Sequence, residues 1–365
     1  MTVPLLELRD IAKRFAATPD LSTRIANRLR RVHDPRIVHA VDGVDLQIAR
    51  GEVVGLVGES GCGKSTLGRV VAGLHAASAG IRLWKGTPIA LEGAHAKAQR
   101  LAIQMIFQDP YASLNPRMRV IDLLTEAPVA HGIRPRAQRE QFAVELLTQV
   151  GLDSSALRRY PHQFSGGQRA RVGIARALAV SPQLLVCDEA VAALDVSTQA
   201  QVLNLFMDLR DTLGLTYLFI SHDLAVVRHL SDRVLIMYLG RIVESAATTD
   251  LYAAANHPYT QALLAETPTL AAGKRHYTVI RGEIPSPLAP PSGCHFHPRC
   301  PRAKDVPGDR CRREQPVLKI VAEGHRSACH LNDLVPDHAT QVASVLREIP
   351  FPTRPSPRIK SGSGS

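Results

Sequence analysis

The stretch GESGCGKST, residues 58–66, sets glycines, a lysine and hydroxyl side chains in the spacing G-x-x-x-x-G-K-[ST]. It follows the apolar run EVVGLVG (52–58), and a helical pattern begins at Lys64. The amides of such a turn can hold phosphate oxygens at a helix N-terminus, while the lysine reaches the outer phosphates. A plain glycine turn before a helix is the alternative. We expect a nucleoside triphosphate site formed by Gly58, Ser60, Gly61, Cys62, Gly63, Lys64, Ser65 and Thr66, with Ser65 on Mg²⁺.

A second stretch, LLVCDEAVAALD (184–195), is an apolar strand that ends in two adjacent acids. Asp188 can hold Mg²⁺ indirectly, and Glu189 can orient and deprotonate an attacking water. Two acids after a strand are commonly just the start of a helix. Together with the phosphate loop, they predict hydrolysis of the triphosphate.

The third stretch, FSGGQRARVGIARAL (164–178), has a serine and two glycines before a helical pattern. The free amides of Ser165, Gly166 and Gly167 could hold an anion, and a simple N-cap is the bland alternative. This stretch resembles the signature sequence of ATP-binding cassette (ABC) ATPases. Other landmarks of that family follow in order: Gln108 in IFQDPYASLNPR, AALD (192–195), and His222 in FISHDL.

The resemblance implies a head-to-tail pair of cassettes with ATP between them. Gln108, Glu189 and His222 are then the catalytic group, and Gln108 joins Ser65 and Asp188 at Mg²⁺. Phe15 is the candidate for stacking on adenine. The residues that would reach the γ-phosphate held by the partner chain are Ser165, Gly166, Gly167 and Gln168.

Within the family, the chain resembles the ATPase subunits of dipeptide, oligopeptide and nickel importers, and most closely the F-type dipeptide subunit. RYPHQFSGGQRAR (159–171), HPYTQALL (257–264) and GEIPSPLAPPSGCHFHPRCP (282–301) carry this resemblance. It implies an ATPase that powers peptide import, with a second ATPase subunit in a heterodimer, two permeases and an extracytoplasmic binding protein. A nickel or other small-solute importer is the alternative.

Four cysteines, Cys294, Cys300, Cys311 and Cys329, fall within 36 residues of a loop-rich segment. Four thiolates suit either zinc or a [4Fe–4S] cluster, either of which would supply folding energy that packing cannot. Several members of the resembled group bind [4Fe–4S] here. The cluster, zinc and free thiols stay open as alternatives, and His295, His297 and His330 are spare ligands for zinc.

The elements that must position these residues alternate between strands and helices. Strands are expected at 5–10, 39–49, 52–58, 101–107, 183–188 and 216–221. A helix is expected over 197–213, with Val202, Leu203, Leu205, Phe206, Leu209 and Leu213 on one side. This alternation predicts an α/β fold with a largely parallel sheet. The family resemblance adds an antiparallel β subdomain and a helical one.

A change in residue composition and hydrophobic pattern divides the chain into an ATPase domain, a C-terminal domain and a tail. We expect an ATPase domain over 1–255 with a helical subdomain at about 110–165. A C-terminal domain with the four cysteines follows over 256–335, and a flexible tail over 336–365. Their boundary lies between 245 and 285, where GEIPSPLAPPSG (282–293) is too proline-rich for a helix or central strand. The Arg-rich stretch 22–36 interrupts the first strands.

The chain has 365 residues, a formal net charge of +11, and no apolar run long enough to span a membrane. Its N-terminus lacks the pattern of a signal peptide. We therefore expect a cytosolic chain, and the resemblance to importer ATPases implies a peripheral position at the cytoplasmic face of the membrane. A nucleic-acid ATPase is a weaker alternative, because residues 270–330 hold 11 Lys and Arg against 5 Asp and Glu. Its usual coiled-coil insert or second cassette is missing, so no nucleic-acid partner is expected.

Overall fold

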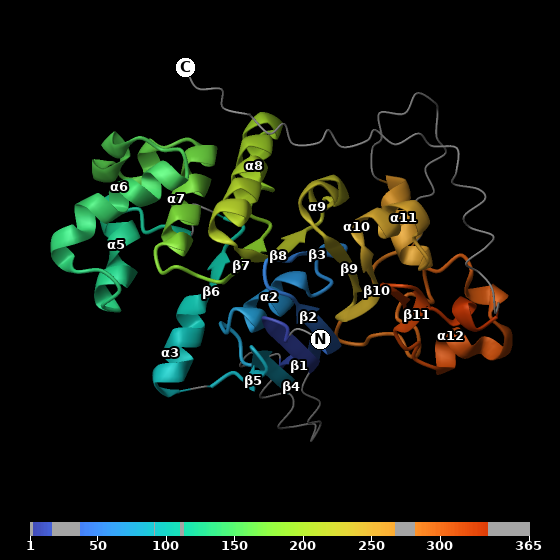
Figure 1. Cartoon of the computed structure of the whole chain (residues 1–365). Helices are drawn as coiled ribbons and strands as arrows, with labels where there is room; N and C mark the ends of the chain where they lie inside the picture. The colour runs from blue at the N-terminus through green and yellow to red at the C-terminus, as the bar shows by residue number, and fades with distance from the viewer. Residues whose placement is uncertain (1–2, 17–36, 91, 110–112, 267–281, 335–365) are drawn as a thin grey trace, which may run out of the picture.

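The computed structural model describes residues 3–16, 37–90, 92–109, 113–266 and 282–334. The Arg-rich stretch 22–36 and the predicted tail over 336–365 lie outside the described residues. Two sheets and several groups of helices make up the described part, with the larger sheet running through its centre (Figure 1). Among these residues, no helix combines the length and apolar character that crossing a bilayer requires.

The larger sheet has eight strands in the order β11-β12-β10-β9-β3-β8-β7-β6. The strands from β9 to β6 are parallel, and β10, β12 and β11 extend them antiparallel. Parallel strands β3, β7 and β8 are buried along their whole length, as a sheet covered on both faces requires. The strands are β3 (Val53–Val57), β6 (Ile103–Ile106), β7 (Leu184–Asp188), β8 (Thr216–Ser221), β9 (Arg233–Tyr238), β10 (Arg241–Ala247), β11 (Lys319–Ala322) and β12 (His325–Ser327).

The smaller sheet is antiparallel and has the order β2-β1-β4-β5. Its apolar face and one face of the larger sheet form a common core with the helix that follows the phosphate loop. This core fixes the smaller sheet beside the phosphate loop. The strands are β1 (Leu6–Ala16), β2 (Ile37–Ile48), β4 (Ala79–Trp84) and β5 (Thr87–Pro88).

The helices form a second core on the other face of the larger sheet and beyond its β6 edge. Helices α5, α6 and α7 group together at that side, and α10 and α11 lie toward the opposite edge (Figure 1). The helices are α2 (Lys64–Val71), α3 (Gly93–Ala102), α5 (Val120–Ala130), α6 (Arg139–Gln149), α7 (Gly166–Leu178), α8 (Val196–Leu213), α9 (Leu224–Leu230), α10 (Thr248–Ala254), α11 (Pro258–Glu266) and α12 (Arg310–Arg313). Single 3₁₀ turns occupy Arg136–Gln138, Ser154–Arg158, Pro161–Gln163, Ala303–Asp305, Pro307–Asp309 and His330–Asp333.

The predicted α/β architecture is confirmed, and two local predictions were wrong. The run 101–107 is not one strand: α3 continues to Ala102, and β6 covers only Ile103–Ile106. Both the end of the helix and the strand are apolar, so periodicity could not separate them. On α8, Leu213 does not share the buried face, because its side chain at the helix end is 47% exposed.

The segment that carries the four cysteines attaches to the larger sheet. Residues 282–293 contain no helix or strand, as the prolines predict. Farther along, β12 pairs with β10, with Glu244 opposite Ser327. The C-terminal segment therefore continues the sheet that also contains the strands of the phosphate loop and the two acids (Figure 1).

Candidate functional site

The phosphate loop closes tightly between β3 and α2. Gly63 has φ 109°, and a Cβ there would lie 2.1 Å from the carbonyl oxygen of Ala40. A side chain at this position would therefore be strained and would clash. Lys64 is buried, and its Nζ donates to the carbonyl oxygens of Gly58 at 2.7 Å and Glu59 at 2.9 Å. The loop thus holds a buried positive charge at the N-terminus of α2, which is suited to an anion.

Ser65 and Asp188 meet although they are 123 residues apart in sequence. Ser65 lies in the first turn of α2 and donates through Oγ to Oδ1 of Asp188 at 2.8 Å. Asp188 ends β7, and burial raises the pKa of its carboxyl while the bond from Ser65 opposes that rise. A hydroxyl and a carboxylate oxygen side by side are the kind of ligands that Mg²⁺ takes.

Glu189 lies where the other two predicted catalytic side chains converge. Its Oε2 accepts a hydrogen bond of 2.7 Å from Nε2 of Gln108, and its Oε1 lies 3.3 Å from Nδ1 of His222. These residues follow β7, β6 and β8, three neighbouring strands whose carboxyl ends share one edge. Glu189 also has φ 48°, a left-handed conformation that is costly for a residue with a side chain. The sheet therefore imposes the position of this carboxylate.

Gln108, the third residue predicted at Mg²⁺, bonds to Glu189 and not to Ser65 or Asp188. It lies on the wall of an open cavity together with the phosphate loop and Glu189. Part of the stretch after it, residues 110–112, lies outside the described residues.

Phe15, predicted to stack on adenine, lies on the wall of that same cavity. Its ring meets His75 edge to face with centroids 5.5 Å apart, and Lys13 Nζ lies 4.8 Å from its centre. The cavity also has a wall residue that the sequence did not suggest. Pro287, from the C-terminal segment, lines it and accepts a hydrogen bond of 3.0 Å from the amide of His39.

The signature stretch forms the N-terminus of α7. Ser165 caps the helix, and its hydroxyl accepts from the amide of Gln168 at 3.3 Å while the Gln168 side chain accepts from the Ser165 amide at 3.1 Å. A Cβ on Gly167 would lie 2.1 Å from Thr198 Cγ2, so α7 and α8 approach closely there. Four described residues predicted to bind the γ-phosphate are absent from the wall of the phosphate-loop cavity: Ser165, Gly166, Gly167 and Gln168.

The four cysteines of the C-terminal segment line one small, apolar cavity. None of these four described cysteines forms a disulfide, and burial raises the pKa values of their thiols, to about 11 for Cys294 and about 12 for Cys329. Among the described residues, no three His, Cys, Asp or Glu side chains converge closely enough to hold one metal ion. The spare histidines each point a ring nitrogen at a carbonyl oxygen: His295 at Leu239, His297 at Cys294 and His330 at Glu314.

Two parts of the chain match known families: residues 41–192 match ABC transporter, and residues 243–306 match oligopeptide/dipeptide transporter, C-terminal region. The oligopeptide transport ATP-binding protein AppF of Bacillus subtilis is 48% identical over 90% of this chain and 97% of its own length. The dipeptide transport ATP-binding protein DppF of Haemophilus influenzae is 46% identical over 81% and 90%. A solved dimeric ATP-binding cassette in a post-hydrolysis state, bound to ADP and Pi, superposes with a TM-score of 0.55. It is 25% identical and covers 67% of this chain and 98% of its own.

Proposed function

The chain belongs to the ABC transporter ATP-binding proteins, and on that premise we propose that it hydrolyses ATP to power import of dipeptides or oligopeptides. One observation carries the hydrolysis: the Gln108 and His222 side chains converge on Glu189 at the edge of the phosphate-loop cavity. Two observations support peptides as the transported substrate. AppF and DppF are named for oligopeptide and dipeptide transport, and residues 243–306 match the C-terminal region of oligopeptide/dipeptide transporters.

In this proposal, the phosphate loop and Lys64 bind the triphosphate, and Ser65 and Asp188 hold Mg²⁺, which neutralises charge on the phosphates. Glu189 orients and deprotonates the attacking water, with Gln108 and His222 holding its two carboxylate oxygens. Phe15 and Pro287 face the base and sugar end of the cavity. The strain at Glu189 supports this role, because such strain gathers at functional sites.

The second half of the ATP site comes from a partner ATPase subunit, and we favour a heterodimer. Support comes from Ser165 and its neighbours, which carry the family's signature but do not line the phosphate-loop cavity of their own chain. In the pair, the N-terminus of α7 would face the γ-phosphate of the other subunit. Two permeases and an extracytoplasmic binding protein complete the transporter, which places the chain at the cytoplasmic face of the membrane. Residues 1–255, with a helical part at about 110–165, form the ATPase domain, and 256–335 form the C-terminal domain.

For the four-cysteine segment, we favour a [4Fe–4S] cluster over zinc. One zinc ion requires four sulfurs about 3.8 Å apart, whereas each thiolate of a cluster binds a different iron and the sulfurs stand farther apart. The four thiols share a cavity without converging as one ion demands. Anaerobic purification with iron, sulfide and zinc analysis tests this: about four irons and four sulfides per chain support the cluster, and one zinc with no iron overturns it.

The transport proposal is tested in the source organism with the gene deleted. Uptake of labelled dipeptides and oligopeptides should be lost, and it should return with the wild-type gene but not with Glu189→Gln. Uptake of labelled nickel serves as the parallel measurement. Loss of nickel uptake with intact peptide uptake would overturn the peptide assignment in favour of the small-solute alternative, and the ATPase assignment would remain.

A further inference from the structure

The phosphate loop is held from outside by an arginine of the four-cysteine segment. Arg299 donates from Nη1 to Oε2 of Glu59 at 2.6 Å and from Nη2 to Oε1 at 2.9 Å. Glu59 is the second residue of the loop, and Arg299 lies 240 positions later, directly before Cys300. Their side chains are 21% and 6% exposed. A largely buried, two-point pair of this kind fixes geometry as well as charge.

The same segment of loop is held at a second point. The amide of Glu59 donates to the hydroxyl of Tyr259 at 2.9 Å, and the carbonyl of Glu59 accepts from Lys64 Nζ at 2.9 Å. Tyr259 packs against Tyr238 and Phe296, with ring centroids 4.7 Å and 5.3 Å away. Glu59 thus connects the lysine of the ATP site to residues of the C-terminal part of the chain.

Arg299 itself is positioned by a compact turn between two of the cysteines. His297 donates its amide to the carbonyl of Cys294 at 2.9 Å, and Arg299 donates its amide to the carbonyl of Phe296 at 3.0 Å. The amide of Cys294 donates to the carbonyl of Cys311 at 2.8 Å, so a third cysteine also braces the turn. Any change in what the thiols bind therefore acts on the turn that presents Arg299.

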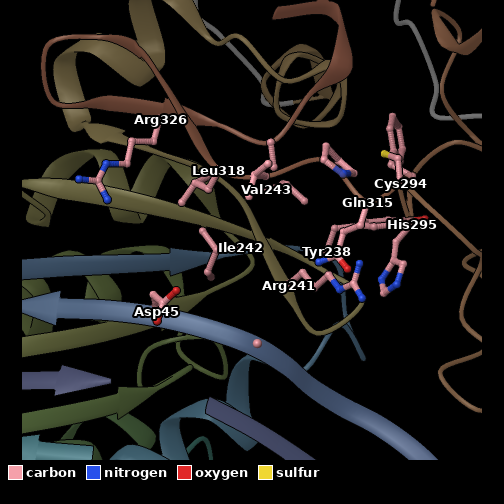
Figure 2. A pocket seen from close by; sticks show the side chains of 15 residues that line it. Asp45, Tyr238, Arg241, Ile242, Val243, Cys294, His295, Gln315, Leu318 and Arg326 are labelled. Carbon is pink, nitrogen blue, oxygen red and sulfur yellow. The ribbon is translucent and has the colours of Figure 1, made fainter. Parts of the chain in front are cut away.

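Small molecules can reach this turn. A cavity between β2, β10 and the C-terminal segment is bordered by Tyr238, Cys294 and His295 at one end, as Figure 2 shows. Val317 on its wall is 69% exposed, so the cavity opens to solvent. Cys294, which is partly buried, therefore forms part of the wall of a cavity that opens to solvent.

We propose that Arg299 is a positioning residue for the phosphate loop, through which the state of the four-cysteine segment sets the affinity of the ATP site. This inference rests on the proposed function, because it requires the phosphate loop to bind ATP. With the segment intact, Arg299 keeps Glu59, and with it the loop carbonyls around Lys64, in the binding geometry. When the thiols lose their ligand or are modified, the turn loosens and ATP is bound more weakly. The affinity of the ATP site would then change with the metal content or redox state of the four-cysteine segment.

The first experiment measures Mg-ATP binding by titration calorimetry with the full chain and with Arg299→Gln. We expect the Kd for ATP to rise about tenfold, which is typical of energetic coupling between sites. KM should rise by a similar factor while kcat stays within about twofold, because Arg299 touches no reacting atom. Arg313→Gln, an exposed arginine of α12 in the same segment, is the matched control and should leave the Kd unchanged.

A role in packing alone predicts a different pattern. Arg299→Gln would then lower the thermal midpoint and the metal content of the chain, with kcat falling along with affinity. Arg299→Lys keeps the charge but loses the two-point geometry, so an intermediate Kd with unchanged metal content supports positioning. In a double-mutant cycle of Arg299→Gln and Glu59→Gln, the effects on the Kd for ATP should be non-additive, because the two side chains act as one pair.

Coupling to the cysteines is tested with Cys300→Ser, and with wild-type chain freed of metal by a chelator. Both should raise the Kd for ATP in the wild-type background and add nothing in the Arg299→Gln background. Equal effects in both backgrounds, or an unchanged Kd in Arg299→Gln while Lys64→Ala abolishes binding, would overturn this inference and leave the proposed function standing. Absence of Lys64-dependent ATP binding in the wild type would overturn both.

Discussion

The ATP cavity and the four-cysteine segment are built by opposite means. In the cavity, Asp188 ends the buried parallel strand β7, and Glu189 and His222 directly follow β7 and β8, two strands that pair with each other in the sheet. In the cysteine segment, turns and very short elements carry the thiols, around a small core of Val306, Cys311 and Leu331. Side chains placed by a sheet are held by its hydrogen bonds, whereas a segment with so little packing gains stability from a bound metal, which is why we propose one there.

The ATP cavity and the four-cysteine segment also differ in how their ionisable side chains are paired. Around the phosphate loop, the buried Lys64 donates to the carbonyl oxygens of Gly58 and Glu59, and Ser65 donates to Asp188, so these polar groups have partners within the protein. The thiols of the cysteine segment are kept neutral by burial, so binding a metal there must first displace their protons. The protein thus holds the first site by its own hydrogen bonds, whereas in our proposal the second is completed by the metal or cluster it binds.

The largest effect expected from this comparison is on catalysis. Glu189→Gln removes the carboxylate that both Gln108 and His222 contact, so ATP hydrolysis should fall about 10²- to 10⁴-fold while ATP binding persists. Phosphate release and equilibrium nucleotide binding measure the two separately. Asp211→Asn, an exposed acid at the end of α8, is the control. Turnover at the wild-type rate in Glu189→Gln would show that Glu189 is not the base.

The next effect should be confined to the cysteine segment. Cys311→Ser should weaken metal binding by more than about a hundredfold, since loss of an outer partner of a metal ligand already costs about that much. Amide exchange should quicken over 294–331 while β7 and β8 stay protected. Metal analysis and hydrogen exchange make the measurement, with Cys62→Ser as the control that keeps its metal. Quickened exchange throughout β7 and β8 would contradict the view that these strands hold Asp188, Glu189 and His222 without help from the cysteine segment.

A smaller effect is expected where the two regions meet, at His257. Burial lowers its pKa to about 4, and its Nδ1 accepts from the amide of Tyr259 at 3.1 Å, which requires the neutral ring. The nearest acid, Glu244, accepts the His257 amide at 3.0 Å and bonds His325 at 2.7 Å.

The pKa of His257 is lower in the folded protein than in the unfolded chain, so the neutral ring's contribution to the free energy of unfolding is complete above about pH 6.5. It is lost as the pH falls toward 4. The loss at pH 5 is about 2 kcal/mol. Thermal melting across pH 5–8 checks it, and His257→Asn should flatten that slope whereas His131→Gln, on an exposed histidine, should not. Equal slopes in wild type and His257→Asn would refute the assignment.

The smallest effect concerns the open end of the ATP cavity, where Phe15 is only partly buried. Phe15→Ala should raise the Kd for ATP about fivefold, because an aromatic stack contributes about 1 kcal/mol. Phe15→Trp should restore binding, and the triphosphate of a base-free sugar should bind both variants alike. Equal loss of affinity for the base-free compound would show that Phe15 does not act through adenine.

The chemistry of this protein was largely predictable from local sequence. The phosphate loop depends on Gly63, Lys64 and Ser65, which are adjacent, and the acids stand directly after a buried strand. Strands and helices with strong periodicity were predicted to within a few residues, such as α8. Predictions failed at 101–107 and Leu213, where an apolar residue near an element's end carries no information about which element or face it joins.

Contacts across long sequence separations were beyond the sequence. Nothing local marks Arg299 as a partner of Glu59 or Pro287 as a wall of the ATP cavity, because an arginine or proline in a loop is ordinary. Those contacts exist because β12 pairs with β10 and brings the cysteine segment against the phosphate loop. The sequence by itself determined which residues do the chemistry, since phosphate and water chemistry need particular groups at short spacing. Only the tertiary structure decided which distant residues hold them, since that depends on how the sheet is completed.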